Sequence, residues 1–369
     1  MRIIFVCGSL EPGKDGVGDY TGRLASQLVK SGHEVRIVAI NDKFSKQIVN
    51  DSYTIENEQF KVLRLPVALA DTEKFEFAKK YVLEFDPEWL SLQYVSFSFH
   101  PKGLPVGIGK KLRQLGEGRK WHIMFHELWV GMELGVSKKE LIWGRLQRIF
   151  IYSLIKTLKP KAVQTHTLLY LMQLEKLGVK TEYFPLFGNI PVTGREVEKN
   201  NKDKLFVVLF GGIHPGAPVK DIATEIAACS KLLNQKICIV FAGRNGAELK
   251  TWQSALETAG VEYQVLGELP TNEVSNLLKK ASYGLSTTPL ALAEKSGSIA
   301  AMVEHGLQVL CVRNEWRSGV KDSVYPINNV MGYEPGKLAE FFNRAKKDVK
   351  PSNTILDSAN VFLKLLEIN

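Results

Sequence analysis

The stretch from residue 2 to residue 32, RIIFVCGSLEPGKDGVGDYTGRLASQLVKSG, decides the fold class of this chain. It opens with an apolar run bounded by glycine, which predicts a buried parallel strand. Beyond a glycine-rich turn, Tyr20, Leu24 and Leu28 recur at helical spacing, and Gly32 is expected to end that helix as its C-cap. The stretch therefore predicts a strand, a loop and a helix, the repeating unit of an α/β fold.

The glycine-rich turn raises the question of which ligand it holds. Gly13 and Lys14 have the spacing of a Walker A loop, but Asp15 stands where that loop needs a hydroxyl for Mg²⁺. Two more glycines, Gly16 and Gly18, follow before the helix is expected to begin. Their backbone N–H groups and the positive end of the helix suit an anion or a sugar. The alternative is a tight turn from strand to helix.

The rest of the chain repeats this alternation of strands and helices in two series. The first series continues from HEVRIVAI to TEYFPLF, and the second runs from LFVVLFGG to LQVLCVR. Between them, residues 191–204 are polar and charged without an apolar period, which predicts a linker. Repeated units of this kind build doubly wound parallel sheets with helices on both faces. We therefore expect an α/β fold of two tandem Rossmann-like domains that face each other across a cleft.

The expected domains cover residues 1–192 and residues 203–350. The closing stretch, SNTILDSANVFLKLLEIN, is predicted to form one amphipathic helix with a Ser or Asn cap. This helix, residues 352–369, is a candidate to pack back on the first domain.

Composition limits the class of protein and its partners. The chain has 369 residues, of which 45% are hydrophobic and 24% charged, the profile of a globular protein with two cores. The net charge of +9 favours an anionic membrane surface or a phosphorylated small molecule as partner, or reflects a basic surface without a partner. Nucleic acid is not expected, because no tract interleaves Lys or Arg with aromatic residues.

Targeting signals and cysteine spacing point to the cytoplasm. No apolar run reaches the roughly 18–20 residues of a membrane span, and the N-terminus lacks a signal-peptide pattern. The four cysteines show no C-x-x-C spacing, so we expect buried reduced thiols and neither a disulfide nor a zinc site.

Ligands of open α/β sheets bind at the loops that follow the carboxyl ends of strands. In the first domain, His126 and Glu127 stand just past the predicted strand in WHIMFHE. An imidazole there can bind a hydroxyl or a phosphate, or carry a proton near neutral pH. The alternative for His126 is a histidine satisfied by neighbouring backbone. His166, in QTHTLL, is the weaker candidate of the same kind.

Two loops of the second domain carry positive charge behind a strand. In LFGGIHPGAPVKD, the open backbone at Gly212 and His214 precedes Lys220 at the expected start of a helix, an arrangement suited to a diphosphate. In FAGRNGAE, Arg244 can reach a phosphate. The alternative for both cations is a solvated surface side chain.

A third loop of the second domain is TTPLALAEKSGSIAAMVEHG. Ser296, Gly297 and Ser298 can present N–H groups to a phosphate, and Glu294 can accept hydrogen bonds from sugar hydroxyls. The alternative is an ordinary serine N-cap with an exposed Glu294 beside it.

Taken together, these loops resemble the glycosyltransferases of the GT-B fold, in particular the retaining family 4 (glycosyl transferases group 1). The resemblance runs from the first strand to about Arg313. It rests on four stretches: DGVGDY, FHE, GELPTNEVSNLLKKASYGLSTT and EKSGSIAAMVEHGLQVLC. It implies that the first domain serves the acceptor and that the second binds a nucleotide sugar.

The resemblance implies transfer of a sugar, with retention of configuration, from a donor such as a UDP- or GDP-sugar to a hydroxyl acceptor. The acceptor would be a glycan, a lipid-linked sugar or a small molecule. No cofactor and no metal are expected beyond that substrate, in agreement with the lack of any Asp-x-Asp in the sequence. The catalytic candidates are His126, Glu294 and Lys220.

The remaining implied contacts are with the donor. The groups expected at its phosphates or sugar are Gly16, Gly18, Gly212, His214, Lys220, Arg244, Ser296, Gly297 and Ser298. Leu266 and Glu304 are the candidates for the base and the ribose.

Two positions depart from the family pattern. Ala301 or Met302 stands where the family has a second Glu, and Ile213 and His214 stand where it has an Arg. These departures support a nucleotide-sugar-binding protein without catalysis as one alternative. A sugar-nucleotide 2-epimerase of the same two-domain shape is another. An NAD-dependent oxidoreductase is disfavoured because no G-x-G-x-x-G follows either leading strand.

Two basic patches, KPK and GKKLRQ, permit peripheral contact with an anionic membrane that bears a lipid-linked acceptor, at the inner face of the plasma membrane. The alternative is that these lysines only keep the surface hydrated.

Overall fold

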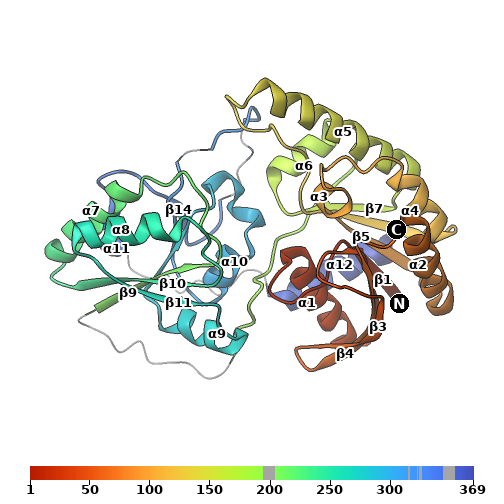
Figure 1. Ribbon diagram of the computed structural model, residues 1–369, viewed down its shortest axis with the longest axis horizontal. Helices are drawn as coiled ribbons and strands as arrows, with labels where there is room; N and C mark the ends of the chain where they lie inside the picture. The colour runs from red at the N-terminus through yellow and green to blue at the C-terminus, as the bar shows by residue number, and fades with distance from the viewer. Residues whose placement is uncertain (194–203, 315, 322, 324–325, 344–353) are drawn as a thin grey trace. The chain divides into compact units, whose positions relative to one another are not determined.

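The computed structural model describes residues 1–193, 204–314, 316–321, 323, 326–343 and 354–369. It divides into two compact units, each with its own sheet (Figure 1). The N-terminal unit comprises Met1–Pro185, Ser318–Ser323 and Ile355–Asn369, and the C-terminal unit comprises Leu186–Arg317 and Val324–Thr354. Most of the expected linker, and the expected capping residues of the closing helix, lie outside the described residues.

The N-terminal unit is built on an eight-stranded sheet of order β3-β4-β2-β1-β5-β6-β7-β8. Its strands are β1 (Arg2–Cys7), β2 (Glu34–Asp42), β3 (Val49–Ile55), β4 (Glu58–Pro66), β5 (Trp89–Tyr94), β6 (Lys120–Phe125), β7 (Ala162–Thr165) and β8 (Glu182–Tyr183). All neighbours pair in parallel except β3, which pairs antiparallel with β4. Glu56 and Asn57, both at positive φ, form the two-residue turn between those strands. No strand was predicted at residues 49–55, so this hairpin was not expected from the sequence.

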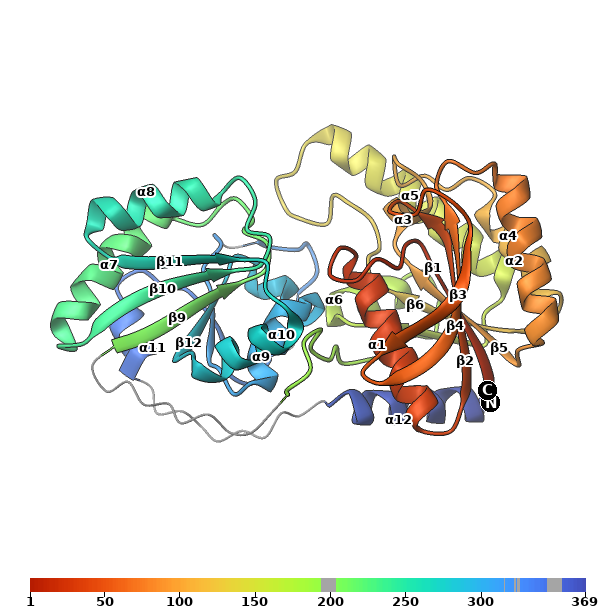
Figure 2. The same cartoon turned by 60° about the horizontal axis from the view of Figure 1, so that its bottom comes forward.

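Helices cover both faces of this sheet (Figure 2). One face carries α1 (Gly16–Lys30) and α12 (Ile355–Ile368), which contact each other. The other face carries α2 (Asp71–Phe85), α4 (Ile108–Gly116) and α5 (Lys138–Leu158). The short helices α3 (Ser96–Phe99) and α6 (Leu168–Glu175) follow β5 and β7.

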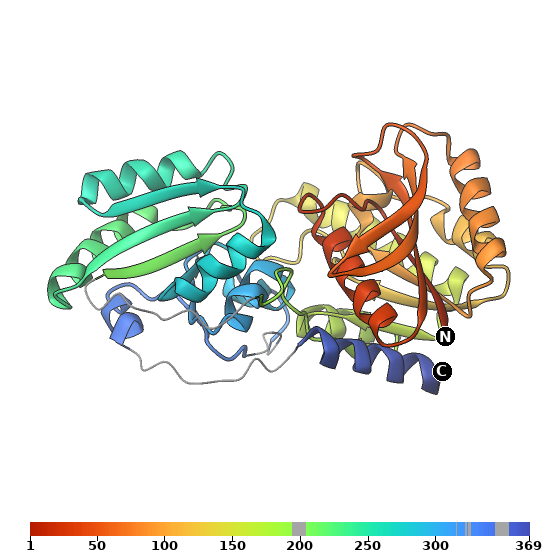
Figure 3. The same cartoon turned by 90° about the horizontal axis from the view of Figure 1, so that it is seen from below.

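The C-terminal unit has a fully parallel six-stranded sheet of order β11-β10-β9-β12-β13-β14 (Figure 3). The strands are β9 (Lys204–Phe210), β10 (Lys236–Ala242), β11 (Glu262–Gly267), β12 (Tyr283–Ser286), β13 (Val309–Cys311) and β14 (Val330–Gly332). Helices α7 (Val219–Leu232), α8 (Leu249–Ala259) and α11 (Leu338–Asn343) bury one face. Helices α9 (Thr271–Lys280) and α10 (Gly297–Glu304) bury the other, and the 3₁₀ helix η1 (Leu290–Lys295) precedes α10.

Burial explains why the central strands could be predicted. In β9 and β10, covered on both faces, apolar residues run almost without interruption, as parallel strands require. All four cysteines are buried and unbridged. Among the described residues, no helix combines the length and the apolar character needed to cross a bilayer. The predicted α/β fold with two parallel-sheet units is confirmed.

The C-terminal helix α12 belongs to the core of the N-terminal unit. The ring of Phe362 is fully buried, stacks on Phe5 of β1 at 5.7 Å and meets His122 of β6 edge-on at 5.1 Å. The other side of the helix is exposed, for example at Val361.

Removing the Phe362 ring is expected to destabilise the N-terminal unit. Phe362→Ala should lower its free energy of unfolding by about 3–5 kcal/mol, because a buried aromatic ring is replaced by a cavity. The matched control Val361→Ala, a half-exposed neighbour on the same helix, should cost less than about 1 kcal/mol. Urea titration with hydrogen exchange of β1 as the readout measures both. Equal effects of the two variants would contradict the packing described here.

Candidate functional site

Polar side chains cluster where β5, β6 and β7 end in the N-terminal unit. His126 follows β6 directly, and His166 follows β7. The Nε2 of His126 lies 2.9 Å from the Oε1 of Gln93, and its Nδ1 lies 3.2 Å from the Nε2 of His166. The Nδ1 of His166 lies 2.8 Å from the backbone oxygen of Phe184. His126 therefore has side-chain partners at both ring nitrogens, and the ring of Tyr20 packs against it at 4.8 Å.

Burial sets the protonation of these imidazoles. It lowers the pKa of His126 well below the ordinary value, with further lowering from His166 and His122, and it lowers the pKa of His166 to about 4. Both rings are neutral at pH 7, so each has one donor nitrogen and one acceptor nitrogen. His126 is thus a hydrogen-bonding group and not a proton carrier near neutral pH.

The contacts of these neutral rings define the tautomers. His166 donates from Nδ1 to the Phe184 carbonyl, so its Nε2 accepts from the Nδ1 of His126. The Nε2 of His126 then accepts in turn, which requires Gln93 to present its amide N–H group. Exchanging the O and N of that amide satisfies this requirement without moving the side chain.

In the glycine-rich loop after β1, the carboxylate of Asp15 caps the helix that follows. Helix α1 begins at Gly16, so the prediction that it begins only after Gly18 was wrong. Asp15 is the N-cap, and its Oδ1 accepts from the amides of Val17 at 3.1 Å and Gly18 at 2.8 Å. A Cβ at Gly18 would lie 2.7 Å from the backbone oxygen of Ser9, so this position requires glycine. Contact of Gly16 and Gly18 with a sugar stays a prediction.

In the C-terminal unit, the turns that follow β9 and β10 touch each other. Gly211 and Gly243 both have positive φ, +96° and +94°, and a Cβ at Gly243 would lie 3.1 Å from the Cα of Gly211. Asn245 ties the two turns together, because its Nδ2 donates to the Gly211 carbonyl at 2.9 Å and its own carbonyl accepts from Ile213 at 3.1 Å. This buried asparagine was not among the predicted site residues.

Two positive side chains from different loops, Arg313 and Lys295, lie near His214 at the carboxyl edge of the six-stranded sheet. The backbone N–H of His214 donates to Thr287 Oγ1, just past β12, at 2.8 Å. Burial lowers the pKa of the His214 imidazole, and the charges of Arg313 and Lys295 lower it further. Arg313 also lies against the same loop, since its Nε would be 3.4 Å from a Cβ at Gly216.

Arg313 and Lys295 were not among the predicted site residues. Arg313 stands two residues beyond β13, so the rule that selected loops at strand ends could have found it. Lys295 ends η1 and directly precedes the predicted serine turn. Each is a single cation in the sequence, and only the folded loops bring them together.

The N-terminus of α10 lies beside the glycine turn after β9. Ser296 caps this helix, with its Oγ accepting from the Ile299 amide at 3.4 Å and lying 3.1 Å from the Oγ of Ser298. A Cβ at Gly211 would lie 3.5 Å from the Cβ of Ser298. The structure thus brings the predicted turns at Gly211–Gly212 and Ser296–Ser298 together. Glu294 is buried in η1, so the alternative of an exposed Glu294 is wrong.

The remaining predicted residues surround this edge or lie away from it. Lys220 is exposed in the first turn of α7, which has no side-chain cap at Pro218. Arg244 follows β10, its backbone oxygen close to Gly212, and its Nε lies 3.7 Å from the Oε2 of Glu268.

Leu266 and Glu304, the candidates for the base and the ribose, lie on different elements. Leu266 is on β11 and 39% exposed. Glu304 is at the end of α10 opposite Ser296, and its Oε1 accepts from the Gly188 amide at 2.7 Å. A contact of Glu304 with the ribose stays a prediction. A ribose hydroxyl would have to share the Glu304 carboxylate with the Gly188 amide.

The arrangement in the C-terminal unit has the chemistry of an anion site. It combines the positive ends of α7 and α10 with two cations near His214, Arg313 and Lys295. Among the residues that the structure describes, no group of three or more His, Cys, Asp or Glu side chains could hold a metal ion.

Comparison with known proteins establishes the fold. No protein-family model and no curated protein matches the sequence. Solved structures match over the whole chain, and two of them are HepE and a starch synthase. HepE of Anabaena, solved with UDP and glucose, is 14% identical with a TM-score of 0.57, covering 100% of this chain and 97% of HepE. The catalytic domain of starch synthase IV from Arabidopsis thaliana, bound to ADP and acarbose, is 13% identical with a TM-score of 0.59. This match covers 100% of this chain and 99% of the starch synthase domain.

A third match is UDP-GlcNAc 2-epimerase from Neisseria meningitidis bound to UDP-GlcNAc. It is 11% identical with a TM-score of 0.56, and the match covers 100% of both chains. At these identities the likeness concerns the fold. The chain has the GT-B fold, as its resemblance to GT-B glycosyltransferases implied.

The buried histidines predict an acid-sensitive N-terminal unit. An unfolded imidazole titrates near pH 6.5, whereas folding lowers the pKa of His122 to about 3, of His166 to about 4, and of His126 well below its ordinary value. Below pH 6.5 the unfolded chain therefore binds more protons, so the free energy of unfolding falls as the pH drops. At about pH 5.5 the loss is about 1.4 kcal/mol per histidine.

Urea titrations at about pH 8 and about pH 5.5 measure this loss. For the three histidines together it amounts to about 4 kcal/mol. His166→Gln removes one titrating group and should reduce the loss by about a third. A stability independent of pH over this range would show that these rings are not held neutral.

Proposed function

We propose that this chain is a glycosyltransferase that moves a sugar from a nucleoside-diphosphate sugar to a hydroxyl acceptor. One observation carries the proposal: the turn after β9, the N-terminus of α10 and the cations near His214 converge at the carboxyl edge of the six-stranded sheet. In open α/β sheets this edge is where ligands bind, and a diphosphate is the part of the donor that such a site suits.

The chemistry of transfer explains why these groups would be needed. When the bond between the sugar and the diphosphate breaks, negative charge develops on the departing oxygen. Lys220, Arg313 and the N–H groups of the Ser296–Ser298 turn would stabilise that charge, as preorganised donors do in other enzymes. The proposed reaction is metal-independent and retains the anomeric configuration.

The other donor contacts follow from the positions of the side chains. Gly212, His214 and Arg244 would lie along the phosphates, and buried Glu294 would accept hydrogen bonds from the sugar hydroxyls. The exposed Leu266 on β11 would contact the base. Glu304 is retained as the candidate for the ribose.

His126, with Gly16 and Gly18, would meet the sugar or acceptor in the N-terminal unit. Because both of its ring nitrogens have partners, His126 must exchange one of them for a sugar hydroxyl. The acceptor would be a glycan, a lipid-linked sugar or a small molecule, handled in the cytoplasm with peripheral contact to an anionic membrane. Nucleic acid is not a proposed partner.

Two other functions remain as alternatives. Ala301 or Met302 and Ile213 stand where family 4 enzymes carry Glu and Arg, which supports a nucleotide-sugar-binding protein without catalysis. The fold shared over its full length with a 2-epimerase supports an epimerase.

Calorimetric titration with UDP, GDP and ADP tests the donor site. One nucleotide should bind selectively, and Lys220→Ala and Arg313→Ala should each weaken it about tenfold, the loss of one charged contact of about 1.4 kcal/mol. Lys231→Ala, in the last turn of the same helix as Lys220, is the matched control and should bind like the wild type. If none of the three nucleotides bound, the proposal would be contradicted.

Turnover separates the three functions. With the nucleotide sugar that matches the selected base, a transferase should release the nucleoside diphosphate faster when an acceptor glycan is added. An epimerase would interconvert two nucleotide sugars without any acceptor, and a binding protein would leave the donor unchanged.

A further inference from the structure

Helix α5 presents a continuous apolar stripe to solvent. Its inner face is packed: Gly144 lies against the Val130 carbonyl, Gln147 accepts from the Val130 amide at 2.9 Å, and Leu154 lies against Gly109 of α4. Its outer face carries large apolar side chains with exposed fractions of 38–60%: Leu141 (42%), Ile142 (57%), Leu146 (38%), Ile149 (60%) and Tyr152 (41%).

The spacing shows that these side chains form one surface. Ile142, Leu146 and Ile149 follow the i, i+4, i+7 pattern of a single helical stripe, on the side opposite the buried residues. Contiguous apolar surface of this kind is uncommon on a soluble protein without a partner. The stripe therefore needs a partner that covers it.

The charges along the stripe are almost all positive. Exposed cations accompany it along the helix: Lys138, Lys139, Arg145, Arg148 and Lys156. The one acidic residue of the helix, Glu140, is engaged at the helix start, where it forms a capping box with Ser137. We call the stripe and these cations the α5 face.

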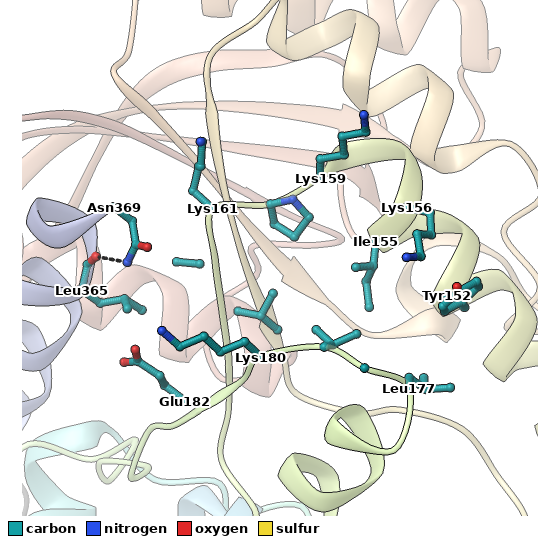
Figure 4. Close-up of a pocket in the computed structure, with 15 residues that line it drawn as sticks. Tyr152, Ile155, Lys156, Lys159, Lys161, Leu177, Lys180, Glu182, Leu365 and Asn369 are labelled. Carbon is teal, nitrogen blue, oxygen red and sulfur yellow. Dashed lines mark hydrogen bonds between the residues drawn. The ribbon is translucent and has the colours of Figure 1, made fainter.

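A cavity lined by lysines adjoins the α5 face at the C-terminal end of the helix. It measures about 370 Å³ and lies at the amino ends of β7 and β8, the edge of the sheet opposite the candidate functional site. Four lysines line it: Lys156, Lys159, Lys161 and Lys180 (Figure 4). Glu182 is the one acidic side chain in the lining, and Tyr152 belongs both to the lining and to the stripe.

We propose that the α5 face docks the N-terminal unit on an anionic phospholipid bilayer. The apolar stripe enters the boundary between headgroups and acyl chains, and the cations of the α5 face contact lipid phosphates. The lysine pocket takes the headgroup of one anionic phospholipid. Stable attachment to a membrane needs two signals of this kind, apolar area and positive charge.

The pattern of charge selects a membrane over a second copy of the chain. A symmetric dimer places the same patch against itself, so the cations of one α5 face would meet those of the other. Long Arg and Lys side chains beside an apolar stripe suit a bilayer better, because their alkyl chains lie along apolar surface while their charges reach the phosphates.

The docking itself needs no turnover. A failure of the proposed glycosyl transfer therefore leaves this inference intact, and the converse also holds.

Flotation with vesicles tests the docking. The full chain should float with vesicles of phosphatidylcholine mixed with phosphatidylglycerol and should stay unbound with phosphatidylcholine alone. Ile142→Ser combined with Ile149→Ser should weaken vesicle binding at least about tenfold, through lost apolar burial. Leu83→Ser, which removes an equally large half-exposed side chain from α2 of the same unit, is the matched control and should bind like the wild type.

Further variants test the lysine pocket and the rival occupants. Lys161→Ala combined with Lys180→Ala should weaken binding to the mixed vesicles about tenfold, and added salt should weaken it further. Equal binding to both kinds of vesicle, or unchanged binding by the stripe variant, would overturn the proposal. So would saturable binding of glycerol phosphate without vesicle binding, or a dimer in light scattering that the stripe variant dissociates.

Discussion

Parallel pairing of β9 with both β10 and β12 is the constraint on which the candidate donor site depends. Because parallel strands share one direction, each of their turns into a helix lies at the same edge of the sheet. Gly211 and Gly243 then lie in close contact, and Asn245, in the turn after β10, fixes the turn after β9 through hydrogen bonds with Gly211 and Ile213. The cations and the serine turn of α10 lie close to these turns because their loops leave the same edge of the sheet.

The two units differ in the charge and the free hydrogen-bonding groups at the carboxyl edge of their sheets. In the N-terminal unit, burial keeps His126 and His166 neutral within a chain of hydrogen bonds, and Asp15 occupies the amides at the start of α1. In the C-terminal unit, burial and neighbouring positive charge lower the pKa of His214, and the start of α7 has no side-chain cap. This difference supports the proposal of an anion in the C-terminal unit and of uncharged groups, such as sugar hydroxyls, in the N-terminal unit.

The elements that the sequence predicted are those with strong local signals. Buried strands such as β9 and β10 show continuous apolar runs. In contrast, β3 is an exposed edge strand with polar residues and β14 lies in NNVMGY, which has no apolar run of strand length, so neither was predicted. The turn at Ser296–Ser298 could be selected from sequence because it begins a helix after a strand. The partners of His126 could not, because Gln93 and His166 reach it only through the pairing of β5, β6 and β7.

The central claim is that a nucleoside diphosphate binds at the carboxyl edge of the six-stranded sheet. Hydrogen–deuterium exchange of the full chain, with and without UDP, GDP and ADP, tests it most directly because it locates the contact by backbone amide. We expect one nucleotide to protect the amides of residues 211–220 and 296–299, with little change at residues 15–18. Protection at residues 15–18 instead, or no protection by any of the three, would contradict it.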